Sequence, residues 1–221
     1  MADALPMNLV FLGPPGAGKG TQAKTFAAHR GLPHVSTGDM FRAAAAAGTA
    51  LGIQAKEFMN KGVLVPDSVV CGLVRERLAK PDCSAGFILD GFPRTTPQAL
   101  DLEQALAASK KAPITCVDFR IDRGELLKRL TARLTCRKCG AVYNTITNPP
   151  KKAGVCDACG GETYTRDDDK AETVGKRQAE YDQKTAPLLQ FYEGRKQLRV
   201  LDASGSPADV AKRLEALFPR T

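Results

Sequence analysis

A glycine-rich loop between an apolar segment and a helix-forming segment is the strongest constraint on the fold of this chain. The loop, Gly13–Thr21, reads Gly-Pro-Pro-Gly-Ala-Gly-Lys-Gly-Thr; it follows Leu9–Leu12 and opens the helical stretch Thr21–His29. Glycines let backbone N–H groups point inward, a helix N-terminus adds partial positive charge, and Lys19 adds a full charge. The loop therefore predicts a polyphosphate cradle, and with it a nucleoside triphosphate as ligand.

One position departs from the usual form of this loop. Gly20 follows the lysine where Ser or Thr is standard, and the hydroxyl arrives one residue later, at Thr21. This departure argues against direct hydroxyl coordination of Mg²⁺ and favours an ion held by phosphate oxygens and water. A glycine turn that serves packing alone is the alternative, and Lys19 with its flanking segments argues against it.

Composition narrows the class of protein. The chain has 221 residues, enough for a substantial core, and a formal net charge of +8 that suits an anionic ligand. The basic residues are dispersed and no aromatic-rich platform for single strands is visible, so we expect no nucleic-acid partner. No targeting segment or membrane span is recognisable, which predicts a cytoplasmic protein without a membrane partner.

Alternating apolar and helical segments predict an α/β fold. The candidate strands are Leu9–Leu12, Leu32–Val35, Phe87–Leu89, Ile114–Ile121 and Leu198–Leu201. Besides Thr21–His29, the candidate helices are Thr37–Ala47, Gly52–Asn60, Asp67–Ala79, Pro97–Ala108 and Arg123–Leu134. This order favours a parallel sheet with helices on both faces. The stretch Thr135–Asp169, rich in Cys, Gly, Pro, Lys and Asp, breaks the pattern and is interpreted as an inserted subdomain.

Four of the seven cysteines form two pairs with metal-site spacing. Cys136 and Cys139 are followed, sixteen residues later, by Cys156 and Cys159. Four thiolates complete a tetrahedral Zn²⁺ site and leave no position for substrate, so the spacing predicts a structural ion in a small lobe. Disulfides or an iron–sulfur centre are the alternatives. The scattered Cys71, Cys83 and Cys116 are interpreted as inert core thiols.

Charged residues suggest what the phosphate cradle is for. Asp90 ends the apolar run Phe87–Leu89, where a carboxylate beside nucleotide-bound Mg²⁺ is expected, and Arg94 follows at the same predicted sheet edge. Further arginines occupy short polar or helix-end contexts, where each taken singly is more typical of a solvated surface. These are Arg42, Arg129, Arg133, Arg166 and Arg177.

Several motifs together resemble adenylate kinase. They are Gly13–Gln22, the Ser-Thr-Gly-Asp-Met stretch Ser36–Met40, and the Asp-Gly-Phe-Pro-Arg-Thr stretch Asp90–Thr95. The later Asn148–Pro150 and Arg166–Val174 are similar to its long-lid bacterial form with a metal-binding lid. The resemblance runs in the same order over about residues 7–205, and in this family Gly-Lys-Gly-Thr is the usual loop.

The resemblance implies the organisation of the chain and its reaction. It implies a P-loop kinase core of residues 1–35, 66–131 and 170–221, with a five-stranded parallel sheet flanked by helices. It also implies a helical monophosphate-binding insertion, 36–65, and a zinc-ribbon-like lid, 132–169. The implied reaction is ATP + AMP ⇌ 2 ADP with Mg²⁺, by a monomer whose substrates are ATP, AMP and ADP.

Site residues carried over from the resemblance fall into three groups. Those implied for ATP are Gly16, Ala17, Gly18, Lys19, Gly20, Thr21, Arg129, Arg133, Val142, Tyr143 and Gly205. Those implied for AMP are Thr37, Arg42, Val63, Leu64, Val65, Gly91, Phe92, Pro93, Arg94, Gln98, Arg166 and Arg177. Those implied for catalysis are Lys19, Asp90, Arg94, Arg133, Arg166 and Arg177, with Asp90 orienting hydrated Mg²⁺.

The chemistry is consistent with many arginines and no general base. The phosphate of AMP is already an anionic nucleophile, so His29 and His34 are interpreted as structural residues. Cations and positioning would stabilise the transferring group, and a closing lid would exclude water.

Other functions remain open from the sequence. A UMP/CMP kinase also carries the Asp90–Arg94 stretch, although the amide of Gln98 suits adenine. A zinc-ribbon nucleic-acid-binding ATPase predicts polynucleotide-stimulated hydrolysis, and a structural zinc module with a vestigial loop predicts no turnover.

Overall fold

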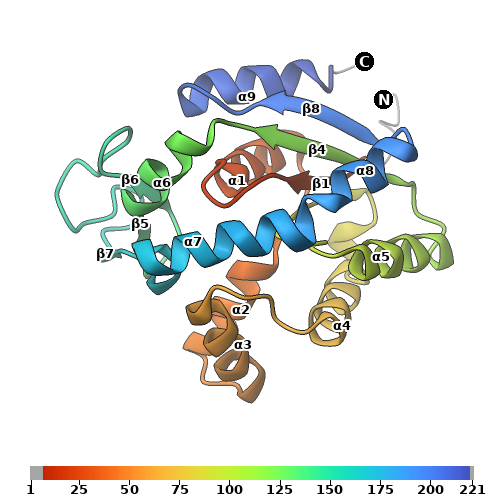
Figure 1. The fold of residues 1–221 in the computed structure, drawn as a ribbon, viewed down its shortest axis with the longest axis horizontal. Coiled ribbons are helices and arrows are strands. Elements are labelled where there is room, and N and C mark those ends of the chain that lie inside the picture. Colours follow the sequence, from red (N-terminus) through yellow and green to blue (C-terminus); the bar gives the residue numbers. More distant parts are fainter. Residues whose placement is uncertain (1–6, 220–221) are drawn as a thin grey trace.

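The computed structural model describes residues 7–219, and its centre is a five-stranded parallel sheet (Figure 1). The strand order is β2-β3-β1-β4-β8. The strands are β1 (Met7–Leu12), β2 (His34–Ser36), β3 (Gly86–Asp90), β4 (Ile114–Arg120) and β8 (Leu198–Asp202). All four pairings are parallel, so the carboxyl ends of β1, β2 and β3 meet at one edge. This confirms the predicted α/β fold.

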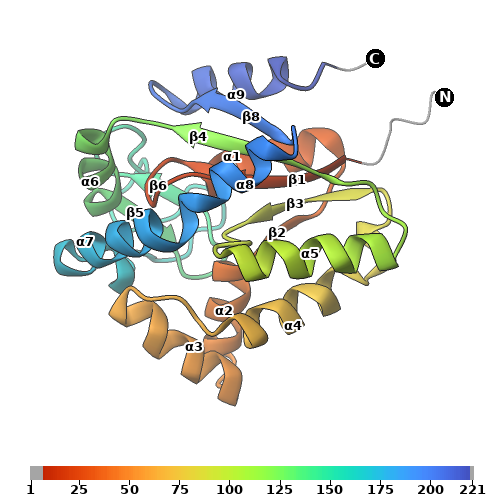
Figure 2. The same ribbon diagram turned by 45° about the vertical axis from the view of Figure 1, so that its right-hand side comes forward.

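Alternating side chains along the strands build one core on each face of the sheet. On one face Val10, Leu89 and Cys116 pack against α4 (Asp67–Leu78), α5 (Thr96–Ala108) and α8 (Pro187–Gly194). On the other, strand residues pack against α1 (Lys19–Arg30), α6 (Arg123–Thr131) and α9 (Pro207–Ala216). Figures 1 and 2 show the sheet held between these helices. The sheet is therefore a fixed platform for its carboxyl edge.

Two helices project from the sheet as a hairpin. They are α2 (Thr37–Ala46) and α3 (Ala50–Lys61), at the bottom of Figure 1. Ser36 caps α2 by accepting a hydrogen bond from the Asp39 N–H, and Thr49 caps α3 through the Gly52 N–H. A Cβ at Gly52 would lie 2.2 Å from Ala44 C and Ala45 N. The absence of that atom lets the two helices approach closely.

A second, three-stranded antiparallel sheet carries the cysteine pairs. Its order is β6-β5-β7, with β5 (Arg133–Cys136) between β6 (Val142–Asn144) and β7 (Thr163–Tyr164). We call residues 133–164 the cysteine lobe. The prediction that the helix beginning at Arg123 continues to Leu134 is wrong. The helix ends at Thr131, because the following residues pair with β6 and β7 on both sides.

Other element boundaries also differ from the sequence prediction by one or a few residues. The second strand begins at His34 rather than Leu32, since the pairing with β3 starts at His34 opposite Ile88. After the lobe the chain forms α7 (Ala171–Glu180) and a π-helical turn, Tyr181–Thr185, which the sequence reading did not identify. Short 3₁₀ turns occupy Pro81–Cys83 and Asp167–Asp169.

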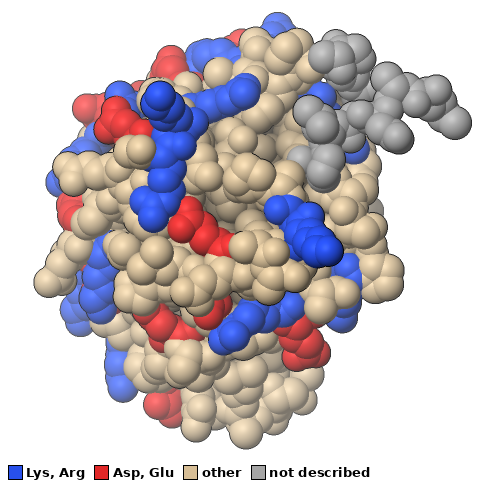
Figure 3. Space-filling view, turned by 90° about the vertical axis from the view of Figure 1, so that its right-hand side faces the viewer, with Lys and Arg blue, Asp and Glu red and all other residues tan. Residues whose placement is uncertain are grey.

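The distribution of basic side chains on the surface, and the length and apolar character of the helices, bear on the choice of partners. Figure 3 shows one face on which Lys and Arg are separated by acidic and uncharged residues. Over residues 7–219, none of the helices has both the length and the apolar character needed to cross a membrane. Cys71, Cys83 and Cys116 are buried, as expected of core thiols.

Candidate active site

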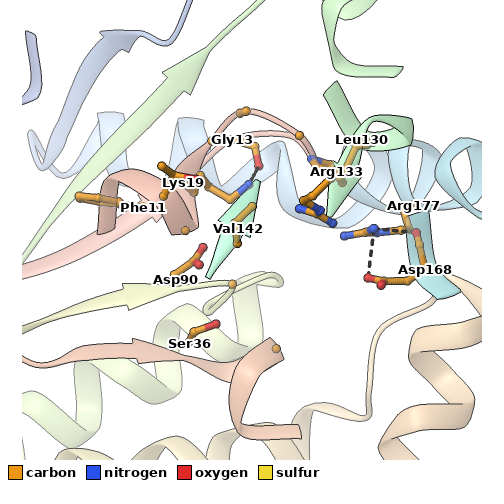
Figure 4. Close-up of a pocket in the computed structure, with 18 of the residues that line it drawn as sticks. Phe11, Gly13, Lys19, Ser36, Asp90, Leu130, Arg133, Val142, Asp168 and Arg177 are labelled. Carbon is orange, nitrogen blue, oxygen red and sulfur yellow. Dashed lines mark hydrogen bonds and ion pairs between the residues drawn. The ribbon is translucent and has the colours of Figure 1, made fainter. Parts of the chain in front are cut away.

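A cavity of about 330 Å³ lies at the carboxyl edge of the parallel sheet. Residues from the loop after β1, from the end of β3, from α2, α7 and the cysteine lobe line it. This is where open parallel sheets bind ligands. In Figure 4, Lys19, Asp90, Arg133 and Arg177 converge on this space from four separate elements.

The loop after β1 presents backbone donors to the cavity. Gly16 and Gly18 have φ values of 89° and 88°, in the left-handed region where side chains are rarely tolerated. Gly18 is the N-cap of α1 and has no side-chain cap hydrogen bond, so the first N–H groups of this helix are available to a ligand. The Lys19 Nζ donates to Gly13 O at 2.7 Å (Figure 4) and to Pro14 O at 2.9 Å.

Lys19 and Asp90 lie partly buried below this loop. The pKa of Lys19 is lowered from 10.5 to about 8, chiefly by burial and also by Arg94, Arg177 and Arg133, while Asp90 opposes the shift. Burial favours the neutral form of Asp90, but His34 and Lys19 outweigh it and hold the pKa below its ordinary value. The His34 Nε2 lies 3.7 Å from Asp90 Oδ2. Asp90 is therefore a carboxylate at neutral pH.

Arginines from distant segments surround the same space. Arg94 donates through Nε to Gly91 O at 2.8 Å, and Arg166 donates to Thr135 Oγ1 at 2.8 Å. Burial lowers the pKa of Arg94, and Arg177 lowers it further. Burial, then Arg133 and Arg42, lower the pKa of Arg166 to about 10. Cations whose pKa values fall because they are buried together form a site that an anion would stabilise.

Two aspartates hold part of this arginine cluster, and sequence reasoning missed them. Asp169, whose side chain is 0% exposed, pairs with Arg133 and, at 2.9 Å, with Arg177. The Arg177 Nη1 also lies 3.1 Å from Asp168 Oδ2. Burial lowers the pKa of Arg133, but Asp169 outweighs it and the net shift is upward. The acidic run 167–169 could have indicated such a role, but its arginine partners cannot be identified from the sequence, because Arg133 lies 36 residues before Asp169.

A second part of the cavity is lined by α2, the segment after α3, and the loop after β3. Thr37 donates through Oγ1 to Gly91 O at 2.9 Å. The Gln98 amide donates to Asp67 Oδ1 at 2.7 Å, and its oxygen accepts from the Arg94 N–H at 2.7 Å. Gln98 lines the cavity and is 2% exposed, so these bonds fix its amide. Phe92 does not line the cavity, because its side chain packs in the core below.

At the opposite end of the cavity, the planar guanidinium group of Arg129 is held by backbone carbonyls. The Arg129 guanidinium donates to Ala203 O at 3.1 Å and to Gly205 O at 3.3 Å. Val142 and Tyr143 of β6 also line the cavity. The next residue, Asn144, donates from its side-chain amide to Arg129 O. A guanidinium face and small backbone groups suit a flat aromatic base.

Nearly all predicted nucleotide-site residues line this one cavity, Phe92 excepted. They are Gly16, Ala17, Gly18, Lys19, Gly20, Thr21, Thr37, Arg42, Val63, Leu64, Val65, Asp90, Gly91, Pro93, Arg94, Gln98, Arg129, Arg133, Val142, Tyr143, Arg166, Arg177 and Gly205. The cavity is also lined by Lys24 and Asp39, which the sequence reading did not single out. Residues more than 180 positions apart therefore share one site.

The four paired cysteines form a separate cluster in the lobe. Their sulfur atoms all lie within 4.8 Å of one another. The Sγ atoms of Cys136 and Cys159 are 3.5 Å apart, and those of Cys139 and Cys156 are 3.6 Å apart. The Tyr143 hydroxyl lies 3.3 Å from the Cys156 sulfur, and this contact, together with the backbone of Ala158 and Cys159, lowers the pKa of that thiol to about 6. The cluster could hold a metal ion.

Comparisons with known proteins agree with this geometry. A family model described as adenylate kinase matches residues 11–197. The chain is 52% identical to an adenylate kinase of Geobacter sulfurreducens over 211 residues, which is 96% of this chain and 97% of the relative. It is 52% identical to one of Archaeoglobus fulgidus over 97% of this chain and 99% of that relative. One from a Geobacillus strain is 54% identical over 87% of this chain and 89% of its own length. This chain belongs to the adenylate kinase family.

Proposed function

We propose that this chain transfers the terminal phosphoryl group of ATP to AMP, giving two ADP, and runs the reaction in both directions. The observation that carries the proposal is the partly buried cluster of Lys19 and arginines at the carboxyl edge of the sheet. Such a cluster suits two polyanions better than one small anion. ATP, AMP and ADP are the substrates and products.

Each end of the cavity has its own role in this proposal. The donor triphosphate would lie on the N–H groups of Gly16–Thr21, with its base against Arg129 and Gly205. The acceptor would lie between Thr37, Arg42 and the loop Gly91–Arg94, with its base beside Val63–Val65 and Gln98. The reacting phosphoryl group would then meet Lys19 and Arg94, with Arg133, Arg166 and Arg177 closing over it.

The reaction needs charge stabilisation rather than a proton acceptor. An AMP phosphate oxygen attacks the γ-phosphorus while the bond to the β-phosphate oxygen breaks, so no proton has to move. The cations stabilise the charge that spreads over the transferring oxygens. Asp168 and Asp169 keep Arg133 and Arg177 oriented, which limits the reorganisation needed at the moment of transfer.

The residues at the cavity fit a nucleotide-bound Mg²⁺. Asp90 is ionised, lies next to Lys19, and has the hard oxygen donors that Mg²⁺ prefers. Asp90 would orient the hydrated ion, and the ion would neutralise charge on the donor phosphates. Lys19 and Asp90 then orient the donor from two sides.

The cysteine lobe fits a structural Zn²⁺. Tetrahedral coordination with Zn–S bonds of about 2.3 Å separates the sulfurs by about 3.8 Å. The sulfur separations of 3.5 Å (Cys136–Cys159) and 3.6 Å (Cys139–Cys156) are close to that value. Cys136, Cys139, Cys156 and Cys159 would hold the ion, which would stabilise a lobe with few apolar residues of its own.

The same function implies a division of the chain into three parts and a location in the cell. We propose residues 1–35, 66–131 and 170–221 as the core, 36–65 as the acceptor-binding insertion and 132–169 as the lid. The lid would close over the donor and exclude water, which protects ATP from hydrolysis. We further propose a cytoplasmic monomer that acts without nucleic acid.

The base of the acceptor is tested by a panel of monophosphates. AMP, CMP, UMP and GMP are each mixed with MgATP, and formation of the matching diphosphate is followed. We expect AMP to be the preferred acceptor, because Gln98 holds an amide at the acceptor end. Efficient use of CMP or UMP would move the activity to a pyrimidine kinase. Hydrolysis stimulated by polynucleotide, with no transfer, would support the ATPase alternative.

A further inference from the structure

Lys24 of α1 contacts both the cysteine lobe and the α2–α3 hairpin. Its Nζ donates to Gly140 O at 2.8 Å, across 116 residues of sequence. The same Nζ lies 3.9 Å from Asp39 Oδ2 on α2. One ammonium group of the core is therefore shared by the two segments that we propose as lid and acceptor-binding insertion.

The lobe presents the Gly140 carbonyl in a fixed direction. Gly140 follows the first cysteine pair, has a φ of 68°, and donates its N–H to Cys136 O at 3.1 Å. This turn belongs to the cysteine cluster rather than to the segments that join the lobe to the core. The contact with Lys24 therefore forms only when the whole cysteine lobe lies close to α1.

The hairpin presents Asp39 in an equally defined position. The Asp39 N–H donates to Ser36 Oγ at 3.3 Å, and its carboxylate pairs with Arg42, which lines the acceptor end of the cavity. Burial favours the neutral form of Asp39, but Arg42, Lys24 and Arg166 hold its pKa below the ordinary value. Arg166, which bonds to Thr135 of the lobe, thus also acts on this carboxylate.

We propose that Lys24 is a positioning residue that couples closure of the lid over the donor to closure of the insertion over the acceptor. When the lobe brings Gly140 to Lys24, the ammonium group is held where Asp39 can meet it, and the converse holds when the insertion closes first. Binding of one nucleotide then favours binding of the other, and by linkage the two effects are equal in size. The inference rests on the proposed function.

The test measures this coupling directly. Affinity for AMP is determined by calorimetry with and without a saturating non-hydrolysable ATP analogue and Mg²⁺, and the ratio is the coupling. Lys24 and Asp39 are 39% and 42% exposed, so solvent weakens the contact. We expect Lys24→Met to lower the coupling, taken as the ratio of that variant's two AMP affinities, about two- to fivefold. In turnover, the loss of coupling should appear as a rise in KM for AMP at saturating ATP.

Two control variants distinguish coupling through Lys24 from the general effect of removing a lysine. Lys24→Arg keeps the charge and the donors and should retain most of the coupling. Lys56→Met removes an exposed lysine of α3 and should leave coupling unchanged. Unchanged coupling in Lys24→Met would overturn the inference. So would loss of affinity for the ATP analogue alone with coupling intact, because Lys24 would then be a phosphate ligand.

The inference and the proposed function fail in different ways. Normal ADP formation by the unmodified chain, with no change of coupling in Lys24→Met, would refute the inference alone. Absence of ADP formation by the unmodified chain would refute the proposed function and the inference with it.

Discussion

Replacing Lys19 by methionine tests whether the cavity stores unfavourable positive charge. Burial, with additional repulsion from Arg94, Arg177 and Arg133, lowers the pKa of Lys19 from 10.5 to about 8. One pKa unit corresponds to about 1.4 kcal/mol, so this shift corresponds to a cost of about 3 kcal/mol in the folded protein at neutral pH. The cost is of the kind that an anionic ligand would offset.

The sign of the pH dependence follows from the direction of the shift. Because the folded-state pKa is below the unfolded value, the folded protein binds fewer protons at Lys19 between pH 8 and 10.5. The free energy of unfolding of the unmodified chain should therefore rise relative to Lys19→Met across this window, by up to about 1.4 kcal/mol per pH unit. Below pH 8 the full cost is present and the difference is constant.

Urea unfolding of both proteins, metal-loaded and free of nucleotide, at several pH values from 7 to 10 measures this difference. Other groups, including the cysteines and tyrosines, titrate in both proteins and cancel to first order. The methionine variant also lacks the hydrogen bonds from Lys19 to Gly13 and Pro14, which shifts the difference in the free energy of unfolding. This shift changes with pH only as Lys19 itself titrates. A difference that stays flat with pH, or that falls as pH rises, would refute the electrostatic argument.

Three other substitutions test separate parts of the molecule. Arg94→Ala should lower kcat at least about a hundredfold with an unchanged thermal melt, since it removes charge beside the reacting group; near-normal turnover would refute that role. Cys136→Ser should lower the bound metal and the melting temperature, and retained metal with an unchanged melt would contradict the site. Gly52→Ala should destabilise, because its Cβ meets the Ala44 backbone, whereas the control Gly72→Ala, whose Cβ meets nothing within 4 Å, should stabilise by up to about 1 kcal/mol. Equal melting temperatures for these two alanine variants would argue against close packing of α2 on α3.

Local motifs made much of the fold and site predictable. Gly13–Thr21 combines a strand end, a glycine loop and a helix start within nine residues, so its structure depends little on distant partners. Asp90 could be placed because it ends an apolar strand, and parallel strands bring their carboxyl ends to one edge. The cysteine spacing likewise predicted the cluster in the lobe.

Features that depend on distant partners could not be predicted. Arg133 and Leu134 continue a helical pattern, yet they belong to the strand β5, because β6 and β7 pair with both edges of that strand. Asp169 reads as one of three exposed acids, but it is buried by arginines from β5 and α7. Lys24 looks like an ordinary helix-surface lysine, and its two contacts arise only when three segments meet.

The central claim is that the cavity transfers phosphate between nucleotides and keeps water out. ³¹P NMR of ATP, AMP and Mg²⁺ with purified protein tests it most directly, because every phosphorus-containing species is seen at once. We predict that ATP and AMP disappear together in equal amounts, that ADP appears at twice that amount, and that no inorganic phosphate accumulates. Release of inorganic phosphate with AMP unchanged would contradict the account.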